Sequence, residues 1–151
     1  MLVRIVSIHC VFLLLATVGC GSGPKFVPVS GTVTLNGQPY GKAVVNFQPI
    51  STTGDPNPGR GSGAHTDENG RYTLVTDDGD KGAIVGKHRI RIMTRGNQTV
   101  IIDPEVGSPD DVPPDMTIDP IPAEWSTHSD KEFVVPRGGT DKANFDIVTK
   151  K

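Results

Sequence analysis

Residues 29–49, VSGTVTLNGQPYGKAVVNFQP, carry the clearest fold signal in the chain. Small or apolar residues alternate with serine and threonine through the first part, at Val29, Gly31, Val33 and Leu35. This period of two is typical of a β-strand with one buried face. Asn36-Gly37 then favours a tight turn, because both residues readily adopt positive φ, and Pro39 ends the first strand. The alternation resumes at residues 43–47 and stops at Pro49, so the stretch predicts two strands joined by a turn.

The composition of the 151-residue chain is typical of a small globular protein built from strands. Hydrophobic residues make up 35% of the chain, which is too many for a disordered protein. The 18 glycines and 13 prolines are too many for a helical protein. A chain of this length can bury a core as a single domain.

The first nineteen residues have the proportions of a signal peptide. Arg4 supplies a positive start, and the apolar run at 5–18 is too short and interrupted for a transmembrane helix, which needs about 20 apolar residues. The run ends in LATVGC, with GSG after Cys20, and this pattern resembles the bacterial lipobox, although Thr17 replaces its usual aliphatic residue. The resemblance implies cleavage after residue 19 and attachment of diacylglycerol to the Cys20 thiol. The alternative is an ordinary secretory signal with an incidental cysteine.

The cysteine and charge counts agree with a lipid anchor. Cys10 lies inside the segment that cleavage removes, so the mature chain would hold Cys20 alone, without a disulfide or a cysteine metal site. Cleavage would remove Arg4 and no acidic residue, which leaves 14 basic and 17 acidic residues and a net charge of −3. This weakly acidic balance argues against a nucleic-acid partner. It offers no polybasic patch for anionic lipid either, so the lipid on Cys20 would be the link to the membrane.

Further strands are predicted after residue 49, separated by turns and two loops. Residues 50–63 form a Gly/Pro-rich loop, and DENG at 67–70 favours an Asx turn before a strand in which Tyr72 and Leu74 share a face. The strand within 82–94 places His88, Ile90 and Ile92 inward and Lys87, Arg89, Arg91 and Met93 outward, where repulsion between cations discourages pairing at an edge. A long Pro-rich, acidic loop follows at 95–123. Strands at 132–135 and 143–148 complete a total of seven.

Several segments follow one another in a recognisable order: VSGTVTLNGQPYGKAVVNF at 29–47, TDENGRYTL at 66–74, GKHRIRI at 86–92, IPAEW at 121–125 and FVVPRGGTDKANFDI at 133–147. Together they resemble the carboxypeptidase regulatory-like domain, and the last two are similar to the end of short bacterial lipoproteins that carry it. The resemblance implies an all-β fold, a seven-stranded transthyretin-like (prealbumin-like) β-sandwich at 27–149. It would follow a cleaved signal peptide at 1–19 and a lipidated cysteine with a short tether at 20–26. It also implies a setting in the cell envelope, and members of this size have no established activity.

The sequence predicts no metal site, no cofactor and no catalytic residue. The histidines left after cleavage, at 65, 88 and 128, have no spacing that places two ligands on one element, and His88 is expected to be a partly buried, hydrogen-bonded residue. DENG at 67–70 and DDGD at 77–80 begin like calcium loops, but side-chain bonds within a turn explain both. Ser126 and Ser129 flank His128 without forming a nucleophilic motif, and no Gly-x-Ser-x-Gly elbow is present.

Three features leave binding or catalysis open. Trp125, the sole tryptophan, could stack on a sugar ring or simply cover an edge of the core. The outward cations at 87, 89 and 91 could bind an anionic polymer or form an ordinary solvated face. The acids at 95–120 are expected to be solvated, and would support an enzyme if two of them and one from elsewhere met in a cleft.

The sequence therefore predicts a non-catalytic protein anchored to a membrane of the cell envelope through Cys20, facing the periplasm or the exterior. It would act as a structural or interaction module on envelope proteins or polysaccharide. A carbohydrate-binding module at the cell surface, with Trp125 as its ligand contact, is the first alternative. An enzyme that uses the acidic loop at 95–120 is the second.

Overall fold

The computed structural model describes residues 24–51, 56–96, 99–103 and 105–149, and these residues form an all-β structure. The large sheet is antiparallel and has the order β11-β8-β4-β5. Its strands are β4 (Ala43–Pro49), β5 (Ser62–His65), β8 (Gly86–Thr94) and β11 (Glu132–Val135).

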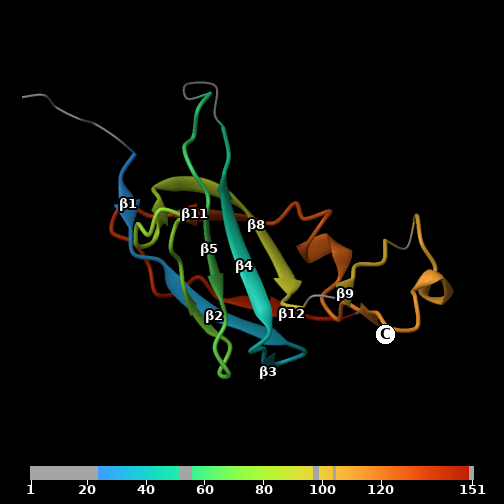
Figure 1. The fold of residues 1–151 in the computed structure, drawn as a ribbon. Coiled ribbons are helices and arrows are strands. Elements are labelled where there is room, and N and C mark those ends of the chain that lie inside the picture. Colours follow the sequence, from blue (N-terminus) through green and yellow to red (C-terminus); the bar gives the residue numbers. More distant parts are fainter. Residues whose placement is uncertain (1–23, 52–55, 97–98, 104, 150–151) are drawn as a thin grey trace, which may run out of the picture.

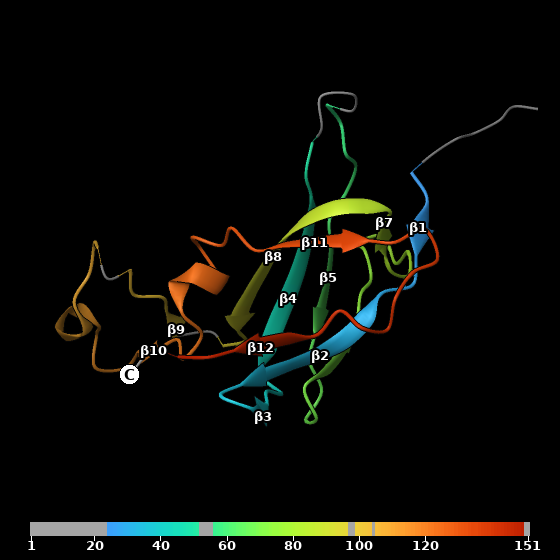
Figure 2. The same ribbon diagram turned by 180° about the vertical axis from the view of Figure 1, so that it is seen from behind.

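The small sheet is built around β2 (Ser30–Leu35). It pairs in parallel with β12 (Phe145–Ile147) and antiparallel with both β3 (Gln38–Pro39) and β6 (Arg71–Thr73). Both views show β2 and β12 crossing the direction of β4 and β5 (Figures 1 and 2). The two sheets are therefore the layers of a β-sandwich-like structure.

Short elements lie at the two ends of this structure. At one end β1 (Phe26–Val27) pairs with β7 (Ala83–Ile84). At the other end β9 (Thr99–Val100) pairs in parallel with β10 (Thr117–Ile118), near the 3₁₀ turns η1 (Pro109–Asp111) and η2 (Ala123–Trp125). Of the twelve strands in the described part of the chain, seven have three residues or more.

The turn predicted at Asn36-Gly37 is confirmed, but the strands on either side of it do not form one hairpin. Asn36 and Gly37 have φ values of 52° and 78°, and Leu35 pairs with Gln38 across them. The returning strand β3 then stops at Pro39, which has no N–H group to extend the ladder. The chain crosses to the large sheet, where β4 pairs with β8 and β5 instead. The buried faces of β2 and β4 therefore oppose each other across the core.

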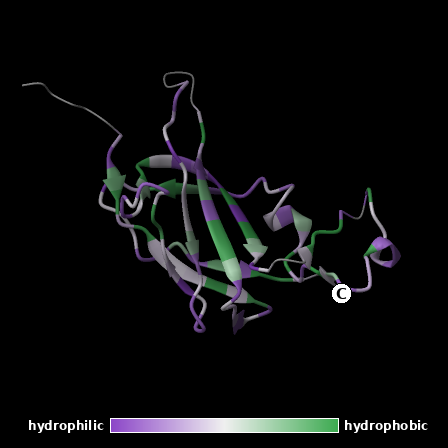
Figure 3. Ribbon diagram, in the orientation of Figure 1, coloured by the Kyte–Doolittle hydropathy of each residue, from purple (hydrophilic) through white to green (hydrophobic). Residues whose placement is uncertain are grey.

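The core lies between the sheets and follows the predicted alternation. His88, Ile90 and Ile92 are buried on β8, while Lys87, Arg89 and Arg91 are exposed. The other fully buried large side chains include Val33, Val45, Phe47, Leu74 and Ile147. Both hydrophobic and hydrophilic residues occur along each long strand (Figure 3). Tyr72 also faces the core, where its hydroxyl donates a hydrogen bond of 2.6 Å to Ala143 O, and burial raises the pKa of its phenol.

One boundary prediction and one placement were wrong. Ser62 and Gly63, predicted in a loop, belong to β5, whereas the strand predicted within 82–94 is confirmed as β8, with the short β7 before it. The outward cations of β8 do not mark an edge, because β8 is an interior strand between β4 and β11. Glu132 of β11 explains part of this tolerance, because its carboxylate accepts a hydrogen bond of 2.8 Å from Lys87 Nζ.

Candidate functional site

Several titratable side chains surround a cavity beside the loop that follows β8. The cavity has a volume of about 550 Å³, and its lining includes Asp103, Glu105, Asp119, Glu124 and His128. The first three residues come from the acidic loop, whereas Glu124 belongs to η2 and His128 to the turn after it. Acids of the loop and one acid from outside it therefore line the same cavity.

The base of this cavity is fixed by Asp119. Its carboxylate accepts hydrogen bonds from Thr94 N at 3.0 Å, from the Thr94 hydroxyl at 2.5 Å and from Ile121 N at 2.9 Å. The residue is 8% exposed, so the expectation that the acids of this loop are solvated was wrong for Asp119. Three donors replace the water that the carboxylate loses, which makes its burial tolerable. Asp119 therefore fixes the last part of the loop to the end of β8.

The exposed side of the cavity contains a polar contact between His128 and Asp103. His128 Nδ1 lies 3.4 Å from Asp103 Oδ2, and the side chains are 61% and 22% exposed. The serines on either side of His128 bond to the main chain, since Ser129 Oγ donates to Ile90 O at 2.5 Å and Ser126 Oγ to Ala123 O at 3.5 Å. Their hydroxyls thus help to fix the turn that carries His128. Asp103 and Glu124 can hold a cationic group, and with His128 they can exchange protons with a bound molecule.

Two acids outside this cavity, Asp111 and Asp67, stabilise local turns. Ser108 and Asp111 cap η1 reciprocally, and Asp67 Oδ1 accepts bonds from Asn69 N and Arg71 N at 2.9 and 2.8 Å. The Asx turn predicted at 67–70 is therefore confirmed. Within the described ranges, no group of three or more His, Cys, Asp or Glu side chains has the geometry to hold a metal ion.

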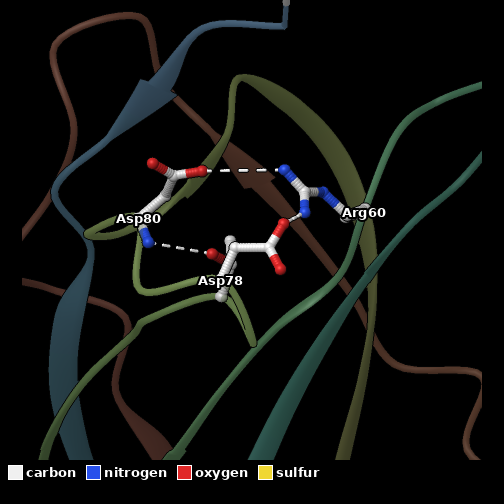
Figure 4. Close-up of polar contacts among 4 residues, drawn as sticks. Arg60, Asp78 and Asp80 are labelled. Carbon is white, nitrogen blue, oxygen red and sulfur yellow. Dashed lines mark hydrogen bonds and ion pairs between the residues drawn. The ribbon is translucent and has the colours of Figure 1, made fainter.

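The turn at 77–80 is joined to the start of β5 by Arg60. Its guanidinium pairs with Asp78, and Arg60 Nη2 lies 3.8 Å from Asp80 Oδ2 (Figure 4). Asp80 N also donates a hydrogen bond of 2.9 Å to Thr76 Oγ1, which closes the turn. All three charged side chains are more than half exposed, so this cluster orders the surface and adds little to stability.

Two residues singled out in the sequence pack against the core. Trp125 is half-buried, with its ring centroid 6.1 Å from that of Phe145 and Lys131 Nζ 5.3 Å from its own centroid. His88 is 1% exposed, and its Nδ1 lies 3.1 Å from Gly86 O. Burial lowers the pKa of His88, and Nε2 has no hydrogen-bond partner among the described residues. The hydrogen bond predicted for His88 is confirmed at Nδ1, but the residue is fully rather than partly buried. Trp125 covers an edge of the aromatic core.

Comparison with known proteins found no match: no family model, no curated protein and no solved structure matches the chain. The likeness to the carboxypeptidase regulatory-like domain therefore stays a prediction. Cys20 and the signal sequence lie outside the described residues. Among the helices of the described part, none is long and apolar enough to cross a membrane.

Proposed function

We propose that the protein is a lipid-anchored, non-catalytic component of the cell envelope whose transthyretin-like β-sandwich acts through contacts made at its surface. The fold part of the proposal is supported by the seven longer strands, which are divided between two opposed sheets. The anchor is supported by the lipobox-like LATVGC at 15–20.

One spatial observation carries the proposal. The strand β1, which begins six residues after Cys20, lies at the opposite end of the structure from β9 and the acidic cavity (Figures 1 and 2). Six residues extend over at most about 20 Å. A lipid on Cys20 would therefore keep the β1 end close to the bilayer and present the cavity end to the surroundings. This is a suitable orientation for a module that meets partners away from its membrane.

The Cys20→Ala variant tests the anchor. We expect the wild-type protein to sediment with membranes and to carry acyl chains on residue 20, because two or more chains give lasting attachment. The variant should lose the lipid and leave the membrane fraction almost completely. Cys10→Ala is the matched control and should behave as wild type. Intact-mass spectrometry of the membrane fraction decides the matter, and an unmodified Cys20 in membrane-bound protein would contradict the anchor.

A hydrolytic activity is the second candidate, because the acidic cavity places Asp103 and Glu124 beside His128. Purified protein would then hydrolyse a member of a panel of chromogenic glycosides and esters. We expect Asp103→Asn to lower that rate by about 100-fold, since general acid–base groups typically contribute 10²–10⁴-fold. Asp110→Asn, an exposed acid of the same loop outside the cavity lining, should leave it unchanged. An inactive wild-type protein, or equal rates in both variants, would reject this candidate.

A further inference from the structure

The outer face of the large sheet contains a groove that runs along β4 and β8. Two adjoining hollows of about 450 and 240 Å³ share Gln48 and Arg91, so they form one continuous depression, here called the arginine groove. The strand register sets its lining, because Asn46 is opposite Arg91 and Gln48 is opposite Arg89. Paired residues of neighbouring strands point to the same side of a sheet. Two amides and two guanidiniums therefore stand together on this face.

Two glycines in and just before the neighbouring strand β5 keep one side of the groove open. Gly63 of β5 is opposite Asn46, and Gly61 precedes the strand. A Cβ on Gly63 would lie 3.0 Å from Asn46 Oδ1, and one on Gly61 would lie 3.0 Å from Phe47 O. Side chains at these positions would crowd the groove wall, so its width depends on their absence.

Some cations in and beside the groove have ion-pair partners, and others have none. Lys87 is paired with Glu132, and Arg60 at the far end is paired with Asp78 and Asp80 (Figure 4). Among the described residues, neither Arg89 nor Arg91 has an ion-pair partner, and both are exposed. Asp77 lines the Arg60 end, and Glu132 is opposite Arg89 with its carboxylate bonded to Lys87 Nζ. Within the groove, the positive charge without an ion-pair partner is therefore located at these two guanidiniums.

We propose that the arginine groove binds a carboxylated polysaccharide. A guanidinium presents two parallel N–H groups that match a planar carboxylate, and Arg89 and Arg91 repeat this donor along one strand. The amides of Asn46 and Gln48 beside them can donate to and accept from sugar hydroxyls. This inference rests on the proposed function, since it names the polymer that an envelope-anchored module would contact.

The number and setting of the cations favour this polymer over other anions. Recognition of an anionic membrane uses clusters of about 4–8 Lys or Arg, and only two unpaired cations are present here. Exposed ion pairs are individually weak. A polymer that repeats its carboxylates, bound by many protein molecules held on one membrane, gains strength from multivalency instead.

The test uses full-length protein in detergent, with polygalacturonate as the probe and neutral galactan as its uncharged counterpart. We expect polygalacturonate alone to bind at low salt, with the binding lost at about 0.5 M NaCl, because exposed charges are screened. The double substitution Arg89→Gln and Arg91→Gln should weaken binding at least about tenfold. Arg71→Gln with Arg137→Gln removes the same charge from exposed positions outside the groove and should bind as wild type.

Two further variants separate the possible explanations. Arg89→Lys with Arg91→Lys keeps the charge but lacks the planar fork, so its affinity should fall between those of wild type and the glutamine variant. Cys20→Ala should keep polygalacturonate binding even though it leaves the membrane, so failure of the anchor and failure of the groove give different results. Equal binding of polygalacturonate by the groove variant and its control, or equal binding of galactan by wild type, would overturn the proposal.

Discussion

Replacing Gly31 with alanine is expected to destabilise the native sandwich strongly. Gly31 lies in β2, and a Cβ at this position would overlap the carbonyl group of Ala143. Both groups belong to the main chain, so no side-chain rotation can relieve the overlap. The segment that leads into β12 would have to move away from β2.

Such a movement would break several interactions together. Ala143 N donates to Ser30 O at 3.1 Å, and the buried hydroxyl of Tyr72 donates to Ala143 O at 2.6 Å. An unpaired buried hydroxyl alone costs about 1–3 kcal/mol. Ile147 of β12, which is fully buried, would shift as well. We expect the free energy of unfolding to fall by at least about 4 kcal/mol, a large part of the 5–15 kcal/mol typical of a domain.

Urea denaturation followed by the fluorescence of Trp125 measures this effect, and Gly138→Ala provides its control. Gly138 has no atom within 4 Å of an added Cβ and does not need positive φ. Its substitution should change the free energy of unfolding by less than about 1 kcal/mol. If the urea midpoint of Gly31→Ala equalled that of wild type, the main chain at Ala143 would not lie against Gly31.

This contact marks the limit of what local sequence patterns predict. The alternation in β2 and β8 and the turns at 36–37 and 67–70 depend on neighbouring residues, and these predictions are confirmed. The pairing of β2 with β12 joins residues 112 positions apart, such as Val33 and Phe145. The sequence shows Gly31 as a small residue in an alternating strand. It does not show that the carbonyl group of Ala143 lies where a larger side chain would be. The same limit applies to the two strands predicted within 29–49, because the sequence does not show that β2 and β4 belong to different sheets.

The candidate site was less predictable than the fold for a related reason. Asp103 and His128 are 25 residues apart and separated by prolines, so no periodic pattern connects them. Asp119 has the same local setting as the exposed acids of its loop, and only the donors from Thr94 and Ile121 distinguish it. By contrast, the outward position of Arg89 and Arg91 follows directly from strand periodicity. The side-chain amides opposite them, Asn46 and Gln48 of β4, are placed there by a strand register that local patterns do not specify.

Replacing Phe47 with alanine is expected to lower the free energy of unfolding by about 3–5 kcal/mol, the usual range for a buried phenylalanine. Phe47 is 1% exposed and lies at the centre of an aromatic cluster that joins the sheets. Its ring centroid is 5.7 Å from that of Phe133 on β11, 5.8 Å from His88 on β8 and 6.1 Å from Phe145 on β12. Removing the ring leaves a cavity in contact with both layers.

Differential scanning calorimetry would detect this loss as a fall in Tm of roughly 10–20 °C. Phe47→Leu keeps most of the volume and should lose less than half as much stability, because the cost rises with the cavity left behind. Val44→Ala on the outward face of the same strand leaves no enclosed cavity and should cost about 1 kcal/mol or less. If Val44→Ala lowered the Tm as much as Phe47→Ala, the face of β4 assigned to the core would be wrong. If the two sheets pack through one aromatic cluster, the loss of stability must be largest for Phe47→Ala, smaller for Phe47→Leu and smallest for Val44→Ala.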